Sequence, residues 1–317
     1  MKLLFCYYSG TGHTKRIVDL YKKNFEERGA AVDVYNIENN NFSFNMQDYD
    51  TIGFFYPVYA FNAPWLMVDF IQSLPPQAAK KSCFIAAASG EPLALNFASR
   101  SKIQTLLKKR NFCITSHCNY VMPYNIIFRH SDERAYAMLE TAKQLVPLDV
   151  QEVISGTSVV PHVPMIFRFI SFVFRIEFWG GRFNGTLYRA TDACTRCGLC
   201  IARCPVHNIA AASDGKPVFG KNCLMCQRCS MYCPTDAIIT GLFNSWKVHK
   251  PYTFKKPAEK MTGAHPFYLR ASYERYFKNA QKRIAAETES AGKCTSTCTL
   301  DTTSKKGVEK NARERTI

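Results

Sequence analysis

The sequence predicts an α/β protein in which a doubly wound, parallel five-stranded sheet is followed by a small α+β domain rich in cysteine. Through residues 1–155, short apolar runs alternate with amphipathic stretches. This β/α alternation is typical of a parallel sheet that helices cover on both faces. Eight of the 14 cysteines then fall within residues 194–233. Their concentration predicts a separate domain built around its thiols.

Five apolar runs are expected to form the strands of the sheet, at residues 2–8, 31–35, 51–55, 82–88 and 113–120. The first helix is predicted from apolar residues spaced by three and four between Ile17 and Phe25, and Gly29 ends it. Further helices are expected near residues 64–73, 96–110 and 132–146. This order of elements indicates an open, doubly wound sheet.

The loop after the first strand has the composition of a phosphate-binding loop. It consists of Ser9, Gly10, Thr11, Gly12, His13 and Thr14. Two glycines, three hydroxyl groups and a helix N-terminus together offer hydrogen-bond donors to a phosphate. The loop lacks the lysine of a P-loop and the glycine spacing of a dinucleotide-binding fold. It therefore predicts a monophosphate such as that of FMN, with the backbone N–H of His13 favoured over its imidazole.

Two further loops are expected beside that phosphate loop, because ligands of such sheets bind beyond the carboxyl ends of the strands. Pro57, Val58, Tyr59 and Ala60 follow the third strand, and Ser89, Gly90 and Glu91 follow the fourth. We expect these residues to hold an isoalloxazine ring and its pyrimidine edge. Ordinary packing is the alternative interpretation for Tyr59 and for Trp65.

The cysteines form two copies of one motif, C-x2-C-x2-C-x3-C-P. The first contains Cys194, Cys197, Cys200 and Cys204, and the second contains Cys223, Cys226, Cys229 and Cys233. This spacing is typical of two 4Fe-4S clusters in which the fourth cysteine of each run binds the other cluster. Cys233 is thus expected to join the first three cysteines, and Cys204 to join Cys223, Cys226 and Cys229. Structural zinc and a disulfide framework are weaker alternatives, because zinc sites typically pair two C-x2-C motifs.

These motifs resemble those of a known protein family. Residues 9–14 resemble the FMN phosphate loop of flavodoxins, and residues 194–209 and 215–234 resemble the cluster-binding runs of the EFR-type ferredoxin family. In that prokaryotic and protist family, a flavodoxin-like domain is fused to a bacterial-type two-cluster ferredoxin. The resemblance covers roughly residues 1–240. It implies a flavodoxin-like domain, a bacterial-ferredoxin-like domain, FMN and two 4Fe-4S clusters in one chain.

The charge and the thiols limit the compartment and the partners. The net charge is +16, and residues 1–150 contribute only +3, from 16 Lys/Arg and 13 Asp/Glu. No nucleic-acid-binding motif accompanies the basic half, so we expect an acidic redox partner protein and no nucleic acid. Thiolate ligands require a reducing compartment, which favours the cytoplasm. The N-terminus does not have the pattern of a signal peptide.

The predicted organisation has five parts: a flavin domain at residues 1–155, a linker with an apolar helix at 156–188, the ferredoxin-like domain at 189–242, a packing segment at 243–286, and a disordered tail at 287–317. The connection itself is expected at 151–164. The apolar segment from Met165 to Trp179 is expected to pack one domain on the other, with contact to a membrane surface as the alternative. Arg168, Arg175 and Arg182 are expected to share one face of it.

The leading hypothesis is an electron-transfer protein that passes low-potential electrons between FMN, two 4Fe-4S clusters and an external redox partner. One alternative is an FMN-dependent reductase of a small acceptor such as a quinone or nitro compound. No general acid is evident beside the flavin loops, which weakens that alternative. The other is a flavin-free iron–sulfur redox sensor or docking protein. Cys6, Cys83, Cys113, Cys118, Cys294 and Cys298 are expected to be free thiols.

Overall fold

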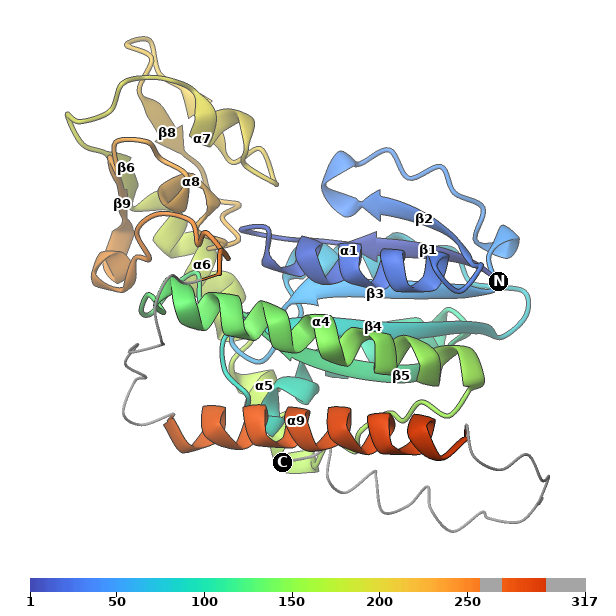
Figure 1. The fold of residues 1–317 in the computed structure, drawn as a ribbon. Coiled ribbons are helices and arrows are strands. Elements are labelled where there is room, and N and C mark those ends of the chain that lie inside the picture. Colours follow the sequence, from blue (N-terminus) through green and yellow to red (C-terminus); the bar gives the residue numbers. More distant parts are fainter. Residues whose placement is uncertain (257–269, 295–317) are drawn as a thin grey trace.

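The computed structural model describes residues 1–256 and 270–294. Its N-terminal half is built on five parallel strands in the order β2-β1-β3-β4-β5 (Figure 1). The strands are β1 (Lys2–Tyr7), β2 (Ala31–Asn36), β3 (Thr51–Pro57), β4 (Lys81–Ser89) and β5 (Phe112–Val121). This order is that of the flavodoxin-like doubly wound fold. All five predicted strands are confirmed, with ends that differ by one or two residues.

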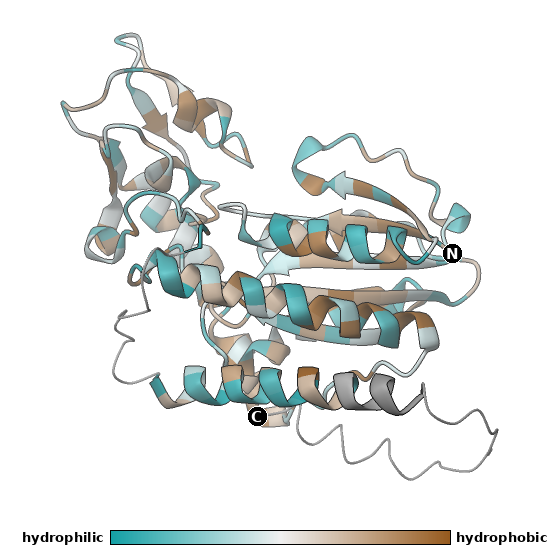
Figure 2. Cartoon of the chain, in the orientation of Figure 1, coloured by the Kyte–Doolittle hydropathy of each residue, from teal (hydrophilic) through white to brown (hydrophobic). Residues whose placement is uncertain are grey.

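Helices cover both faces of the sheet, and the apolar strands lie between them (Figure 2). One face is covered by α1 (His13–Glu26) and α4 (Asp132–Ser155), and the other by α2 (Trp65–Ser73) and α3 (Ser101–Lys109). Neighbouring residues of β1 face opposite ways: Leu3 and Phe5 pack with α1, whereas Leu4 and Cys6 face the α2 side. This period of two explains why the central strands are apolar almost throughout.

Short 3-10 helices complete the connections: η1 (Ile37–Asn39), η2 (Met46–Asp48), η3 (Ala94–Arg100) and η4 (Gly241–Trp246). The helix expected at 96–110 is therefore two elements, η3 and α3. The helix α4 also runs further than expected and ends at Gly156, which adopts the left-handed conformation. The first residues of the connection expected at 151–164 are thus helical, because α4 continues through Pro147.

Residues 188–240 form a compact unit with an internal repeat. It contains β6 (Tyr188–Ala190), α7 (Leu199–Ala202), β7 (Ile209–Ala211), β8 (Pro217–Phe219), α8 (Arg228–Met231) and β9 (Ile238–Thr240). The pairs β6–β9 and β7–β8 are antiparallel. Positive backbone φ angles recur 29 residues apart, at the pairs Arg196 and Met225, Gly198 and Gln227, and His207 and Asp236. The two cysteine runs therefore share one local backbone geometry as well as one motif.

The segment from Met165 to Trp179 is not one helix. It is divided into α5 (Met165–Val173) and α6 (Ile176–Thr186). Because the helix breaks between Val173 and Ile176, the expectation that Arg168, Arg175 and Arg182 share one helix face is wrong. The segment does contact both halves of the chain, since α5 packs on η3 and α6 packs on η4.

Residues 243–277 are expected to pack on the cysteine-rich unit, and the start of this segment does so: Asn244 accepts the Thr240 N–H at 3.0 Å, and Lys247 donates to the Ile238 carbonyl at 3.1 Å. The helix that follows packs on the sheet domain instead. The helix α9 (Arg270–Cys294) lies along α4 (Figure 1). Arg283 donates to Asp149 at 2.7 Å and to Glu152 at 3.0 Å. The tail expected to be disordered from residue 287 is helical as far as Cys294, and residues 295–317, including Cys298, lie outside the described part.

Candidate functional site

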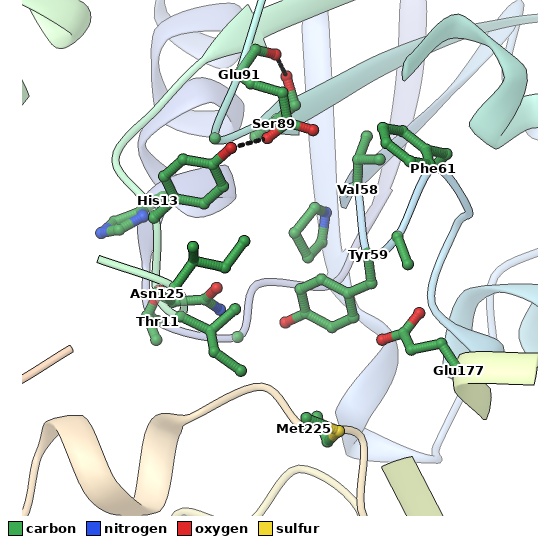
Figure 3. Close-up of a pocket in the computed structure, with 18 of the residues that line it drawn as sticks. Thr11, His13, Val58, Tyr59, Phe61, Ser89, Glu91, Asn125, Glu177 and Met225 are labelled. Carbon is green, nitrogen blue, oxygen red and sulfur yellow. Dashed lines mark hydrogen bonds between the residues drawn. The ribbon is translucent and has the colours of Figure 1, made fainter. Parts of the chain in front are cut away.

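A cavity of about 750 Å³ lies at the carboxyl edge of the sheet. All three loops expected to form a cofactor site line it: Ser9, Gly10, Thr11, His13, Thr14, Pro57, Val58, Tyr59, Ala60, Ser89, Gly90 and Glu91. Gly12 is the only predicted residue of these loops that does not line it. The cavity lies where the strand order reverses between β1 and β3, which is the position where such sheets bind ligands. Figure 3 shows side chains from several elements converging on it.

The loop before α1 presents unused polar groups to this cavity. Gly12 is the N-cap of α1 with φ 93°, a conformation that favours glycine. The Ser9 hydroxyl accepts the backbone N–H of Lys15 at 3.1 Å. The Thr14 hydroxyl is buried and has no hydrogen-bond partner. A buried hydroxyl without a partner is costly, so Thr14 marks a place where a ligand oxygen would be stabilised.

The imidazole of His13 does not belong to the polar part of the site. Its ring is buried against Tyr252 and Phe254, at centroid distances of 5.5 and 5.4 Å. Burial, with a smaller contribution from Arg16, lowers the pKa of His13 to about 4. The ring is therefore neutral at pH 7, in agreement with the preference given above to the backbone N–H of His13.

Tyr59 stands at the junction between the cavity and the cysteine-rich unit. A Cβ atom placed on Gly10 would lie 2.5 Å from the Tyr59 hydroxyl and 3.1 Å from the Cβ atom of Cys226. A larger residue at position 10 would therefore force the Tyr59 hydroxyl to shift and would press on Cys226. The phosphate loop, the aromatic loop and a cysteine thus meet at one point.

The loop of Ser89, Gly90 and Glu91 is closed by its own hydrogen bonds. The Ser89 hydroxyl donates to the Glu91 carbonyl at 2.8 Å, and Tyr124 donates to the Glu91 carboxylate at 2.5 Å. The Tyr124 ring packs so closely on Gly90 that a Cβ there would lie 2.3 Å away. This loop therefore offers the cavity a rigid wall and backbone groups rather than a free carboxylate.

Sequence reasoning missed several contributions to the cavity, including those of η4 (Phe243 and Trp246) and of the junction between α5 and α6 (Phe174 and Ile176). Residues 122–127 follow β5, Glu177 comes from α6, and Met225 comes from the second cysteine run. The loop after β5 could have been found, because it follows a strand of the same sheet edge. Glu177 and Met225 lie far away in sequence, so no local pattern points to them. In Figure 3, the Glu177 carboxylate points toward the space beside Tyr59, with Met225 across from it.

Glu177 is the acid that the sequence did not reveal. Its Oε2 is buried and has no hydrogen-bond partner. Burial raises the pKa of this carboxyl from 4.5 to about 7, because a low-dielectric environment disfavours the charged form. The side chain can therefore gain or lose a proton near neutral pH while facing the cavity. That is the property required of a general acid or base.

The eight motif cysteines line two separate hollows. Cys194, Cys197, Cys200 and Cys233 line one, and Cys204, Cys223, Cys226 and Cys229 line the other. Each hollow thus contains three cysteines of one run and the fourth cysteine of the other run. Burial raises the pKa of the Cys229 thiol, and Cys226, Cys223 and Cys204 raise it further. Cys200, which lines the other hollow, raises this pKa as well.

Within residues 1–256 and 270–294, no three His, Cys, Asp or Glu side chains are placed to hold a single metal ion. The motif cysteines and those of the sheet domain, Cys6, Cys83, Cys113 and Cys118, are free thiols. In the same part of the chain, no helix is both long and apolar enough to cross a bilayer.

Arg228 fixes the cysteine-rich unit to the phosphate loop. Its guanidinium donates to the carbonyls of Ser9 and Gly10, each at 2.6 Å, and to both carboxylate oxygens of Glu38 at 2.7 Å. A further N–H group donates to the Arg203 carbonyl at 3.0 Å. The side chains of Arg228 and Glu38 are only 16% and 13% exposed.

Two weaker contacts extend this interface along the loop. The Tyr232 hydroxyl donates to the Thr11 carbonyl at 2.9 Å, and the Asn125 amide donates to the Cys226 carbonyl at 3.1 Å. Every loop carbonyl from Ser9 to Thr11 is therefore bonded to a side chain of the second cysteine run.

No protein-family model and no curated protein matches the chain. Solved structures match about half of it. A flavodoxin from the domain Archaea is 13% identical, covers 49% of this chain and 99% of its own, and has a TM-score of 0.34. Oxidised flavodoxin 1 from Bacillus cereus is 15% identical over 47% of this chain and 97% of its own, with a TM-score of 0.33. The strand order described above itself identifies the flavodoxin-like arrangement of the N-terminal half.

Proposed function

We propose that this protein is an electron carrier that holds FMN at the sheet edge and two 4Fe-4S clusters in the two cysteine hollows, and that exchanges low-potential electrons with an acidic redox protein. The observation that carries the proposal is the grouping of the cysteines, three from one run with the fourth from the other. This is the ligand exchange that two-cluster ferredoxins require. A zinc site or a free-thiol protein has no reason to exchange its fourth cysteine.

The cavity fits a flavin mononucleotide. The Thr14 hydroxyl and the loop N–H groups at the start of α1 would hold the phosphate, since a helix N-terminus favours an anion. The wall formed by Val58, Tyr59 and Gly90 would hold the ring. Bound flavin supplies chemistry that takes electrons in pairs and releases them singly. The protein's part is to orient that ring beside the cysteines and to keep water from it.

The hollows fit iron–sulfur cubes. Backbone N–H groups already donate to ligand sulfurs, from Asn208 to Cys204 at 3.2 Å and from Ala237 to Cys233 at 3.3 Å. Such bonds stabilise negative charge on sulfur and tune the potential of a cluster. A cube carries one iron at each ligated corner, so its four thiolates stand further apart than the ligands of a single ion. The lack of a compact single-ion site is consistent with this larger group.

The two hollows are not equivalent with respect to the cavity. Cys226, of the hollow that contains Cys204, contacts Gly10 and is held there by Arg228 and Asn125. Met225 of the same run lines the cavity itself. We therefore infer an order in space: flavin cavity, Cys204-containing hollow, Cys233-containing hollow. The external partner would dock beside the last of these, where Cys197 is exposed.

Replacing Thr14 by Val should weaken FMN binding by roughly ten- to hundredfold, because a charge-assisted hydrogen bond contributes about 1.5–3 kcal/mol. Riboflavin lacks the phosphate and should bind both proteins alike. Flavin fluorescence titration measures both ligands, and Thr105→Val, which removes an exposed hydroxyl of α3, is the matched control. Equal losses for the two ligands would refute the phosphate site.

Replacing Cys233 by Ser should damage the same cluster as replacing Cys197, although Cys233 belongs to the other run. Likewise Cys204→Ser should reproduce Cys226→Ser. Iron and sulfide analysis with electron paramagnetic resonance of the reduced proteins compares the four variants, and Cys118→Ser is the control that should lose nothing. If the Cys233 spectrum matched that of Cys226→Ser, the exchange of the fourth ligands would be wrong.

A reductase of a small acceptor is the second candidate, and Glu177 is the observation that favours it. A quinone takes up two electrons and two protons, and the Glu177 carboxyl faces the cavity where such an acceptor would lie. If Glu177 delivers one of these protons, quinone turnover should fall as the pH rises through about 7, because the raised pKa keeps the acid protonated only below that value.

The Glu177→Gln variant should turn over quinone at least roughly tenfold more slowly, without that pH dependence. Turnover is followed by steady-state absorbance at several pH values. Flavin content should be unchanged in the variant. A wild-type rate that does not change between pH 6 and pH 8, or an unimpaired variant, would leave Glu177 without this role.

A further inference from the structure

The helix α5 leaves most of its large apolar side chains exposed. Ser171 is its only fully buried residue. The Ser171 hydroxyl donates to Asn62 at 2.9 Å, and the Asn62 amide donates back to the Ser171 carbonyl at 2.9 Å. A surface helix of a globular protein ordinarily buries its apolar stripe. This helix instead buries Ser171 against Asn62, of the loop after β3, and half-buries only Phe167 and Ile170.

That outer stripe continues from α5 onto α6. Met165 is 76% exposed, Ile176 72% and Trp179 71%. The residues that are half or more exposed lie at spacings of one, three and four: Met165, Ile166, Phe169, Phe172, Val173, Ile176, Trp179 and Phe183. A run of large apolar side chains on this scale is rare on soluble monomers and indicates a surface that something covers.

The charges beside the exposed apolar stripe favour a negatively charged binding surface. Arg168, Arg175 and Arg182 lie on these two helices and their junction, and the only acid there is Glu177, which faces the interior. Arg168 is exposed, whereas Arg175 is half-buried and donates to Asn62 at 3.4 Å. The half-buried Arg182 guanidinium lies 5.1 Å from the centre of the Trp65 ring and 5.5 Å from that of Trp179. Arginine and tryptophan together are typical of the interface between lipid headgroups and acyl chains. The whole chain carries +16, so a second copy would bring like charges together.

We propose that the outer face of α5 and α6 seats the protein on the surface of an anionic lipid bilayer. The apolar side chains would enter the acyl boundary, and the exposed Arg168 would pair with a headgroup. This is peripheral attachment, since no described helix can span a bilayer. It does not depend on the proposed clusters, because the stripe lies outside both cysteine hollows. Ile176 is the one residue of the stripe that also lines the cavity.

The cavity at the sheet edge opens onto this same surface. Phe174, Ile176, Ile127 and Trp246 line the cavity and are each more than 40% exposed. These residues form an apolar rim that connects the cavity with the outer stripe. On a bilayer, the cavity mouth would therefore lie at the acyl boundary, within reach of a lipid-soluble molecule.

Flotation of the full-length protein with its cofactors tests the proposal. Wild type should float with phosphatidylcholine vesicles that contain phosphatidylglycerol, and far less with phosphatidylcholine alone. Trp179 should shift its fluorescence to shorter wavelength only with the anionic vesicles. Raised salt should weaken the binding without abolishing it, because the apolar contribution is not screened.

Phe169→Ser combined with Trp179→Ser should reduce binding by roughly a hundredfold, since each buried aromatic contributes about tenfold or more. Neither residue lines the cavity. Val218→Ser, at a residue 55% exposed on β8, is the control and should bind as wild type does. The proposal is overturned if wild type does not float, or if the double variant floats equally well. It is also overturned if gel filtration shows a dimer that the double variant abolishes while vesicle binding is absent.

Discussion

The buried guanidinium of Arg228 joins the halves of this protein, and the proximity of the cavity to the cysteines depends on it. Its donors are divided between a carboxylate, Glu38, and the carbonyls of the loop after β1. Each of these partners needs a donor, because all are largely withdrawn from water. Loss of Arg228 would leave the Glu38 carboxylate without its partner, which costs about 3–5 kcal/mol for a buried pair. The planar guanidinium of Arg228, with its five donors, thus fixes the position of the cysteine-rich unit relative to the sheet domain.

Glycines make the close approach possible where Arg228 directs it. Cys226 rests on Gly10, and Cys223 rests on Gly185 of α6, where a Cβ would lie 2.1 Å from the cysteine Cβ. Any other residue at these positions would separate the cysteine loop from the sheet edge. The closeness of the two sites therefore depends both on cysteine side chains that pack directly on glycine and on the hydrogen bonds of Arg228. This arrangement would keep the distance between the proposed redox groups constant.

Local patterns were sufficient for much of the fold and for the grouping of the cysteines into two hollows. The strands could be predicted from apolar runs, because both faces of a central parallel strand are buried. The grouping of the cysteines from Cys194 to Cys233 could be predicted from the spacing of the repeated motif. The loop residues Thr14 and Tyr59 followed from the rule that ligands bind at the carboxyl edge. Residues whose role is set by tertiary contacts could not be found this way.

Glu177 and the orientation of α5 show where that reasoning stops. The sequence around Glu177 indicates only an apolar helix with one acid, and its burial beside the cavity arises from how α6 docks. The period of α5 gives an apolar and a polar side, but not which of them faces the protein. The orientation of α5 is fixed by the hydrogen bonds between Ser171 and Asn62, which are 109 residues apart in the sequence. The same docking exposes the apolar stripe and opens the cavity beside it.

The central claim is that flavin and clusters form one conducting unit within a single chain. Because the cavity and the Cys204-containing hollow meet at Gly10 and Cys226, electron exchange between the proposed groups would need no diffusional encounter. The most direct measurement is anaerobic flash photoreduction of the flavin, with cluster reduction followed by absorbance over a wide range of protein concentration. The account predicts a first-order rate that does not change with concentration. A rate that rises in proportion to protein concentration would contradict it.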